Sequence, residues 1–436
     1  MAIRVLAVSP RFAPTNGADT HRLRLLLEHA EAAGWSVEVL AVDAADVVGP
    51  VDPWLSARVP ASVLVHRVRA WRRRGWGLNG LAQRSAVALY RKGCELLASG
   101  RFDLVFFSTT EFPLHALGPL WRRKFGVPFC MDFQDPWVND YYRLHPHIVP
   151  PGGRLKYAIA DRMHRLMEGA VVRRCSGFLS VSNAYLDDLA TRHGAAIRDK
   201  PWLVRPFPAE PDELQALATD DDGCDVSANS GVWRYIGRGG GDMAKAARAF
   251  FSAWTHALES GAMQAGDARF EAIGTSYAGG GRGQPSFAPL VDGTPLATRV
   301  TENTERLGYA DMLRTLMRSD ALIVFGSDDP AYTASKIYPY LLAGKPLLAI
   351  FHRRSSVVSL IQEVGGGVCV CFDETTTQEV LAEDIANTWF RSRAWTKPVP
   401  LDRERFEPYT ARAQTRDLHE WFGEVLACAA KQQRHS

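Results

Sequence analysis

The feature that most limits the possible folds of this chain is a repeated alternation of short apolar runs with longer amphipathic segments. The run 3–8 (IRVLAV) is apolar and β-branched, and Pro10 closes it, which predicts a buried strand. Leucines on one helical face follow and end at Gly34, and a second apolar run occupies 36–42. A strand, a helix and a strand in this order predict a parallel sheet, because parallel strands need a crossover connection.

The alternation continues through the first two hundred residues and then starts again. Further strands of the first half are expected at 103–107, 127–131 and 177–181, with helices at 115–125 and 155–172. Strands of the second half are expected at 232–236, 270–273, 321–325 and 346–351, with helices at 243–258, 310–317, 335–343 and 378–386. The sequence therefore predicts an α/β protein with two doubly wound, Rossmann-like domains.

Two segments interrupt this pattern. Acidic, small and turn-forming residues fill 209–231, which indicates a linker, and glycines and prolines fill 278–294, which indicates a mobile loop or an insertion. We therefore expect an N-terminal domain at 1–208 and a C-terminal domain at 232–400. The remaining residues, 401–436, are expected to form helices that cross back to the first domain.

Length and composition exclude several classes of protein. A chain of 436 residues, 46% hydrophobic and 23% charged, is long enough for two or three folded domains and is unlike disordered or fibrous proteins. No apolar run has the length of a membrane span, and residues 1–10 do not resemble a signal peptide, so a cytoplasmic location is expected. The seven cysteines lack paired spacings, which argues against a disulfide framework and structural zinc. Residues 1–200 carry a net charge of +9 and residues 201–436 carry −6.

Ligands of open parallel sheets bind at the carboxyl ends of the strands, so the loops that follow strands are the candidate sites. In the first half, Asn16 and Gly17 precede a helix that begins with Asp19 and Thr20 in its first turn. A glycine there lets the backbone approach a phosphate or a sugar, and the amino end of the helix favours an anion. The alternative is an ordinary turn glycine before a capped helix.

A glycine-rich loop follows the strand expected at 232–236. Its sequence at 237–241 is GRGGG, and Lys245 lies one turn into the next helix. Arg238 can bind a diphosphate with two hydrogen bonds, and Lys245 adds a second positive charge. No Gly-Lys-Ser/Thr follows, so this is not a Walker sequence, and a flexible solvated turn is the alternative.

The third candidate lies within 307–350, where a strand ends in a polar, acidic loop. Residues 333–336 (TASK) open a helix that stops at Gly344. Backbone amides, two hydroxyls and an ammonium would then converge at the positive end of a helix, which favours a phosphate. The alternative is that Ser335 only caps the helix.

These loops resemble those of a known family, the GT-B glycosyltransferases, and particularly the large retaining family that builds bacterial polysaccharides and lipopolysaccharides from nucleotide-sugars. The resemblance covers nearly the whole chain. It rests on Asn16-Gly17, on VPFCMDFQDPW at 127–137, on FLSVSNAYL at 178–186, on Ile236-Gly237-Arg238 with Lys245, and on Ser335-Lys336 with AGKP at 343–346. It implies the GT-B architecture, in which two Rossmann-like domains face each other across a cleft.

The resemblance also implies roles for particular residues. Arg238 and Lys245 would neutralise the donor diphosphate, and the helix start at 333–336 would hold its distal phosphate. The residues implied to bind the donor are Asn16, Gly17, Arg238, Lys245, Gly308, Tyr309, Thr333, Ser335 and Lys336, with Gly308 and Tyr309 beside the nucleobase. No metal and no cofactor are implied besides the nucleotide-sugar co-substrate, because side chains and helix ends balance the charge of the leaving diphosphate.

Two carboxylates of the first half are the catalytic candidates. By the same resemblance, Asp135 and Glu111 would face the sugar or the acceptor. If the enzyme inverts the configuration of the sugar, one of them is the candidate base, whereas a retaining enzyme needs no strong base. Asp132 and Asp135 also have an alternative role, because two acids near a strand end can cap the turn before Pro136.

The sequence departs from the family at two positions. The family commonly carries two glutamates eight positions apart, one near the donor sugar and one that holds the ribose, and this chain has Ala331 and Pro339 there. A catalytically silent relative that binds a nucleotide or a glycan is therefore the main alternative to an active transferase. A sugar-nucleotide epimerase of the same architecture is a second alternative, but the sequence offers no convincing acid/base set for it.

Basic and aromatic residues alternate at 66–76 (HRVRAWRRRGW) and at 121–125 (WRRKF). Arginines can hold anionic head groups while Trp rings rest at a membrane interface. The candidate membrane or acceptor residues are Arg69, Trp71, Arg72, Arg73, Arg74 and Trp76. The alternative is a solvated charged face, and nucleic acid is not expected because no binding motif accompanies the charges.

The expected function is transfer of a sugar from a nucleotide-diphosphate-sugar to a glycan or lipid-linked glycan acceptor, in bacterial surface polysaccharide assembly. Positioning and electrostatics would carry the chemistry, and closure of the cleft would exclude water. The protein is expected in the cytoplasm, with a peripheral position at the inner membrane.

Overall fold

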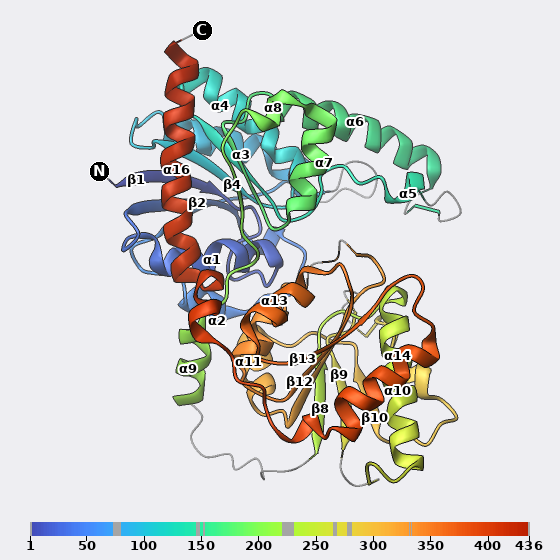
Figure 1. Cartoon of the computed structure of the whole chain (residues 1–436). Helices are drawn as coiled ribbons and strands as arrows, with labels where there is room; N and C mark the ends of the chain where they lie inside the picture. Colours follow the sequence, from blue (N-terminus) through green and yellow to red (C-terminus); the bar gives the residue numbers. More distant parts are fainter. Residues whose placement is uncertain are drawn as a thin grey trace. The chain divides into compact units, whose positions relative to one another are not determined.

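The structure is a computed structural model of the chain, and it describes residues 2–72, 80–144, 149–150, 153–219, 231–264, 268–276, 281–330, 332 and 334–434 (Figure 1). The chain divides into two compact units. Unit 1 comprises residues 1–208 and 411–436, and unit 2 comprises residues 209–410. Each unit is built on one parallel sheet with helices between the strands, as the sequence predicts.

The sheet of unit 1 has seven parallel strands in the order β3-β2-β1-β4-β5-β6-β7. Their bounds are β1 Ile3–Val8, β2 Trp35–Val42, β3 Leu64–Val68, β4 Leu104–Ser108, β5 Phe129–Phe133, β6 Gly177–Ser180 and β7 Trp202–Val204. Every residue of β4 and β5 is buried, because helices cover both faces of the sheet and both sets of alternating side chains enter the core.

The helices of unit 1 connect successive strands and cover the sheet. Their bounds are α1 Ala18–Ala30, α2 Pro53–Ala57, α3 Leu81–Leu97, α4 Leu117–Phe125, α5 Tyr141–Leu144, α6 Arg154–Val172, α7 Asn183–His193, α8 Ala195–Arg198 and α16 Ala411–Arg434, with short 3-10 turns η1 Ala44–Asp46 and η2 Phe112–Ala116. Although α16 is the last helix of the chain, it packs against α1 and β1 (Figure 1). The ring of Phe422 on α16 lies 5.3 Å from the ring of Trp35 and 5.5 Å from that of Phe106, so α16 is part of the core of unit 1.

The sheet of unit 2 has six parallel strands in the order β10-β9-β8-β11-β12-β13. Their bounds are β8 Val232–Ile236, β9 Arg269–Ile273, β10 Val300–Asn303, β11 Ala321–Phe325, β12 Leu347–His352 and β13 Val368–Phe372. The helical segments are α9 Pro211–Thr219, η3 Gly241–Met243, α10 Ala244–Glu259, η4 Ala288–Val291, α11 Tyr309–Met317, α12 Ile337–Leu342, α13 Ser356–Val364, α14 Gln378–Ile385, η5 Ala386–Arg391, η6 Ala394–Thr396, α15 Arg403–Phe406 and η7 Glu407–Tyr409. Trp233 anchors the core, with its ring 5.6 Å from that of Trp254 and 5.8 Å from that of Trp389.

The prediction that 209–231 is a linker is wrong for its first half. Residues 211–219 form α9, a helix of unit 2 that buries Glu213, Leu214 and Leu217. Acidic residues in this segment indicated a turn, but Asp212 and Glu213 occupy the first turn of a helix, where negative charge is stabilising. Residues 220–230 lie outside the described part of the chain.

Two other segments also differ from expectation. The segment 401–436 is divided between the two units, because α15 and η7 belong to unit 2 and only α16 belongs to unit 1. The described part of the loop 278–294 is anchored rather than mobile, since the backbone amides of Ser286, Phe287 and Ala288 each donate to the Glu302 carboxylate at 2.8 Å. Among the described residues, no helix is both long enough and apolar enough to cross a membrane.

Candidate functional site

The loop after β8 lies at the carboxyl edge of the sheet in unit 2 and holds the first candidate cation, Arg238. Its guanidinium forms a two-point ion pair with Asp242, at 3.0 Å and 2.7 Å, and lies 4.7 Å from the centre of the Tyr332 ring. Burial opposes the charge of Arg238, but the hydrogen bonds to Asp242 more than offset it and raise the pKa of Arg238. Burial likewise opposes ionisation of Asp242, yet Arg238 lowers the pKa of Asp242. Arg238 is therefore protonated, and the nearby Asp242 carboxylate balances part of its positive charge.

Lys336 lies beside the same loop. Its ammonium donates to the Tyr235 hydroxyl at 2.7 Å, and that hydroxyl donates in turn to the Arg238 carbonyl at 2.6 Å. A Cβ atom on Gly237 would lie 2.2 Å from Nζ of Lys336, so a side chain at this position would force the lysine ammonium to move. Burial, together with the positive charges of Arg238 and Arg306, lowers the pKa of Lys336 to about 7.

This lowered pKa shows that the surroundings of Lys336 favour added negative charge. A lysine held next to an arginine loses part of its positive charge near neutral pH, because the two cations repel each other and burial removes hydration. An anion bound near both residues would reverse that shift. The arrangement is therefore suited to a phosphate or diphosphate group.

Lys245 is positioned differently from Arg238 and Lys336. It lies in the first turn of α10, and its ammonium donates to the Asp373 carbonyl at 2.7 Å and lies 5.4 Å from the centre of the Phe372 ring. Its charge is thus engaged by the loop after β13. The second cation beside Arg238 is therefore Lys336 and not Lys245.

The prediction that 333–336 forms the first turn of a helix is wrong for its described residues. Helix α12 begins at Ile337, and Ser335 lies in an exposed turn before it. Pro339 gives the physical reason: in a helix that began at 335, its ring would clash with the Ser335 carbonyl and one hydrogen bond would be lost. Thr333 and Ala331 lie outside the described residues.

Gly308 and Tyr309, expected beside a nucleobase, lie at the amino end of α11. Gly308 precedes the helix, and the Tyr309 hydroxyl donates to the buried Glu213 carboxylate of α9 at 3.1 Å. This bond ties the start of α11 to α9 within unit 2. This bond is not predictable from the sequence, in which the acidic and turn-forming residues of 209–231 indicate a linker.

In unit 1, Asn16 and Gly17 lie between β1 and α1. The Asn16 side-chain oxygen lies 2.9 Å from Nε2 of His21, its backbone amide donates to the Pro50 carbonyl at 2.8 Å, and Gly17 precedes the first turn of α1. Asp19, in that turn, is buried, and one of its carboxylate oxygens has no hydrogen-bond partner among the described residues. Burial raises the pKa of Asp19 to about 7, although the charge of Arg11 opposes the shift. The sequence predicts Asp19 in the first turn of this helix, as observed, but gives no sign that its carboxylate is buried.

The two catalytic candidates have different environments. Glu111 is paired with Arg11 at 3.0 Å and accepts the Ala82 backbone amide at 3.1 Å, which ties it to the start of α3. Asp135 is exposed and makes no hydrogen bond or ion pair with any described residue, while the protein around its carboxyl removes part of its hydration and raises its pKa. Asp135 is therefore available to a ligand, whereas the Glu111 carboxylate is held by Arg11 and by the start of α3.

A buried ion pair supports the loop that carries Asp135. Arg22 on α1 donates to Asp132 at 3.1 Å, and both side chains are inaccessible to solvent. The Ser108 hydroxyl and the Gln134 side-chain amide also donate to Asp132, at 3.1 Å and 3.3 Å. Asp132 thus holds the carboxyl ends of β4 and β5 together and is not accessible to a ligand.

The basic and aromatic segments expected at a membrane or acceptor are only partly described. Trp71 is 62% exposed and Arg72 is exposed, while Arg69 is paired with Asp46 at 2.7 Å. Arg73, Arg74 and Trp76 lie outside the described residues. The second segment was misread, because Trp121 is fully buried on the core side of α4 and its ring stacks 5.9 Å from that of Phe107.

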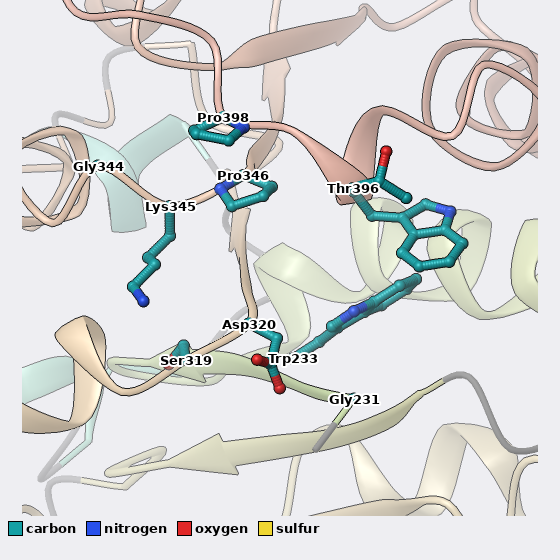
Figure 2. A pocket seen from close by; sticks show the side chains of 10 residues that line it. Gly231, Trp233, Ser319, Asp320, Gly344, Lys345, Pro346, Thr396 and Pro398 are labelled. Atoms are coloured by element: carbon teal, nitrogen blue, oxygen red, sulfur yellow. The ribbon is translucent and has the colours of Figure 1, made fainter. Parts of the chain in front are cut away.

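A pocket of about 610 Å³ lies at the opposite, amino-terminal edge of the sheet in unit 2 (Figure 2). It is lined by residues that precede β8, β11 and β12, including Gly231, Asp320, Lys345 and Pro346. Gly344, with φ +62°, makes the turn between α12 and β12. The AGKP segment therefore shapes this turn and pocket, and its residues lie away from the loop of Arg238.

Two Rossmann-like units, each with polar and charged loops at the carboxyl edge of a parallel sheet, give the fold of the GT-B glycosyltransferases. Residues 17–207 match a family described as the glycosyl transferase 4-like domain, which confirms the resemblance inferred from the sequence. No curated protein matches the chain by sequence.

Solved structures match both units together. A UDP-forming α,α-trehalose-phosphate synthase from Burkholderia xenovorans is 13% identical, with a TM-score of 0.62 over 99% of this chain and 100% of that one. HepE of Anabaena, solved with UDP-glucose, is 13% identical, with a TM-score of 0.56 over the whole of both chains. WaaG, described as a glycosyltransferase involved in lipopolysaccharide biosynthesis, is 11% identical, with a TM-score of 0.53 over 98% of each chain.

Proposed function

We propose that this protein is a glycosyltransferase that takes a sugar from a nucleoside-diphosphate-sugar and transfers it to a glycan or lipid-linked glycan acceptor. The observation that carries the donor assignment is that two cations, Arg238 and Lys336, lie close together at a glycine loop on the carboxyl edge of the sheet in unit 2. HepE, which has the same fold, was solved with UDP and with UDP-glucose, and this supports a nucleotide-sugar as the donor.

The donor diphosphate would lie against the loop 237–241. Its negative charge would raise the pKa of Lys336, and Arg238 would exchange part of its contact with Asp242 for a two-point contact with phosphate. As the bond between the sugar and the diphosphate breaks, charge develops on the leaving oxygen, and both cations would stabilise it. We propose on this basis a transfer that needs no metal and no cofactor.

The acceptor would bind at the carboxyl edge of unit 1. Asp135 is the exposed carboxylate there, and its raised pKa suits a group that orients or deprotonates an acceptor hydroxyl. We propose retention of configuration, in line with the resemblance to the retaining family, and Asp135 would then position the acceptor and would not be a strong base. The likeness to WaaG, a glycosyltransferase involved in lipopolysaccharide biosynthesis, supports an acceptor used in surface polysaccharide assembly. We also propose a cytoplasmic protein with a peripheral position at the inner membrane.

A second candidate is a silent relative that binds a nucleotide without turnover. Two observations favour it: Pro339 stands where the family has a glutamate that grips the ribose, and Asp242 already neutralises Arg238. Such a protein would bind a nucleoside diphosphate but would not cleave the nucleotide-sugar.

A thermal-shift screen with UDP, GDP, ADP, CMP and dTDP tests the donor assignment. A native-state ligand raises Tm, and at a concentration about 100 times Kd it stabilises by roughly 2.7 kcal/mol. We expect one diphosphate to raise Tm of the wild type and of Lys345→Ala, a matched lysine at the opposite edge of the sheet, but not of Arg238→Ala. If no nucleotide raises Tm at millimolar concentration, the donor assignment fails.

A further inference from the structure

Helix α6 of unit 1 exposes large apolar side chains along its outer side. The exposed fractions are 77% for Leu155, 64% for Ile159, 44% for Met163 and 68% for Leu166. Their spacings of four, four and three residues place all four on one stripe of the helix. Helices of a folded unit normally turn such a stripe inward, so an apolar stripe that faces solvent indicates a binding surface.

The other exposed residues of α6 are small or basic, with no acid among them. The exposed set, which we call the α6 outer face, is Arg154, Leu155, Lys156, Ala158, Ile159, Arg162, Met163 and Leu166. On a helical projection, Lys156 lies at one border of the apolar stripe and Arg162 at the other. Neither side chain forms an ion pair with a described residue, so both charges are available to a partner.

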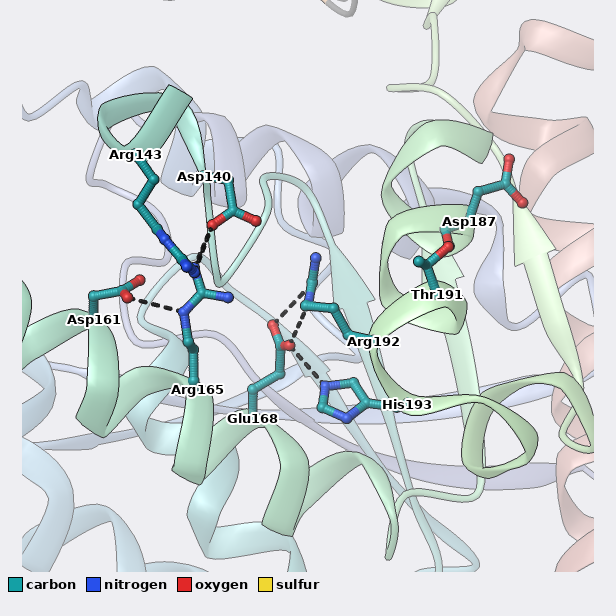
Figure 3. Close-up of polar contacts among 9 residues, drawn as sticks. All are labelled: Asp140, Arg143, Asp161, Arg165, Glu168, Asp187, Thr191, Arg192 and His193. Atoms are coloured by element: carbon teal, nitrogen blue, oxygen red, sulfur yellow. Dashed lines mark hydrogen bonds and ion pairs between the residues drawn. The ribbon is translucent and has the colours of Figure 1, made fainter. Parts of the chain in front are cut away.

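The acidic side chains of α6 do not lie on the outer face and form ion pairs with neighbouring residues of unit 1. Glu168 is buried and accepts hydrogen bonds from Arg192 at 3.0 Å and, at 2.8 Å, contacts the ring of His193, both from α7 (Figure 3). Asp161 pairs with Arg165 at 2.9 Å, and Arg165 also contacts Asp140 (Figure 3). These contacts fix the rotation of α6, and they leave the outer face with positive charge only.

The start of α6 lies near the loop that carries Asp135. The Tyr157 hydroxyl donates to the Asn139 carbonyl at 3.3 Å, which joins the first turn of α6 to the chain after β5. A helix that connects parallel strands begins at their carboxyl edge. A surface bound by the outer face would therefore lie close to the edge where the acceptor is proposed to bind.

We propose that the α6 outer face docks onto an anionic lipid bilayer, with α6 parallel to the membrane plane. An apolar stripe bordered by basic residues is the pattern of helices that bury their apolar side at the boundary of head groups and acyl chains. Each Lys or Arg near an anionic surface strengthens binding by about fivefold, since about 1 kcal/mol is gained per residue. A helix of a protein partner would require acidic groups to match Lys156 and Arg162, and a second copy of this face offers none.

The inference rests on the proposed function in one respect only: docking would bring the acceptor edge of unit 1 to a lipid-linked acceptor. Docking itself needs neither donor nor acceptor. Vesicle binding can therefore fail while the donor assignment holds, and the reverse is also true.

Co-sedimentation of the full chain with vesicles tests the proposal. The vesicles contain either phosphatidylcholine alone or phosphatidylcholine mixed with anionic phosphatidylglycerol, because a negative surface attracts basic segments. We expect binding to the anionic vesicles that falls with added salt, because exposed charges are screened. Leu155→Gln/Ile159→Gln/Leu166→Gln is expected to lower the partition constant at least about tenfold, because the buried apolar area is lost.

Two further variants make the test specific. Lys156→Gln/Arg162→Gln is expected to weaken binding about tenfold or more and to reduce its salt dependence. The control Val87→Gln/Leu120→Gln/Val380→Gln removes three exposed apolar side chains of other helices and is expected to bind as the wild type does. Equal binding by the wild type and both α6 variants would overturn the proposal. So would a wild type that ignores vesicles and instead forms a dimer that the α6 variants abolish.

Discussion

The ammonium of Lys336 donates to the hydroxyl of Tyr235 at 2.7 Å and lies over the Tyr235 ring, 4.7 Å from its centre. This contact holds a lysine next to a glycine loop and an arginine, at the carboxyl edge of unit 2. Because burial and nearby cations lower the pKa of Lys336 to about 7, the site changes its charge within the physiological range.

Donor binding should depend on pH through Lys336. Below pH 7 the free protein already carries the proton, so the affinity is constant there. Above pH 7 an anion must bring a proton with it, and the affinity should fall by up to about tenfold per pH unit until the pKa of the complex is reached. Calorimetry with an intact nucleoside-diphosphate-sugar in two buffers measures this uptake, and Lys336→Met should abolish it. No proton uptake at pH 8 in the wild type would contradict the assignment.

Gly237→Ala should weaken donor binding about tenfold or more, because its Cβ would lie 2.2 Å from Nζ of Lys336 and would displace a charged hydrogen-bond donor. Gly241→Ala is the matched control, since a Cβ there meets no atom within 4 Å. The measurement is Kd for the diphosphate found in the thermal-shift screen. Equal losses in the two variants would show that loop flexibility, and not Lys336, determines the affinity.

Substitutions of the two candidate carboxylates of unit 1 should differ in whether they mainly lower kcat or mainly lower Tm. Asp135→Asn is expected to lower kcat by about 100-fold or more with little change in Tm, because Asp135 has no described partner and is proposed to orient the acceptor hydroxyl. Glu111→Gln is expected to lower Tm more than kcat, since it breaks the ion pair with Arg11. The reverse order would make Glu111 the catalytic residue.

Loss of the buried ion pair between Arg22 and Asp132 should lower the free energy of unfolding more than loss of a solvent-accessible ion pair of unit 1. Asp132→Asn leaves a buried guanidinium without its counter-charge and should reduce the free energy of unfolding by about 3–5 kcal/mol. Asp103→Asn, which removes the exposed partner of Arg4, should have little effect. Urea denaturation compares the two variants, and a loss for Asp132→Asn no larger than that of Asp103→Asn would refute the structural role.

The sequence predicts every interior strand of the two sheets and none of the edge strands β3, β7, β10 and β13. Interior parallel strands are covered on both faces and therefore appear as continuous apolar runs, as in β11. Edge strands are partly exposed: β3 has no buried residue, and β7 has only three residues in all. The sequences of β3, β7 and β10 do not differ enough from loops to be recognised, whereas β13 (VCVCF) is an apolar run that is not among the predicted strands.

The candidate site was predictable only in part. Arg238 and Lys336 are near each other as the resemblance implies, but Lys245 turns to the Asp373 carbonyl, which is remote in sequence. The start of α12 at Ile337 is predictable, because Pro339 disfavours a helix that begins at Ser335. The raised pKa of Asp19 depends on burial by distant segments, and periodicity alone gives no measure of that.

The most direct test of the central claim is sugar transfer itself. A radiolabelled nucleoside-diphosphate-sugar of the class found by thermal shift is incubated with the protein and a membrane lipid extract, and labelled lipid and free diphosphate are measured. We expect both products from the wild type and from Lys345→Ala, and neither from Arg238→Ala. A wild type that binds the donor in this assay yet releases no diphosphate and labels no acceptor would contradict the claim and would identify the protein as a silent relative.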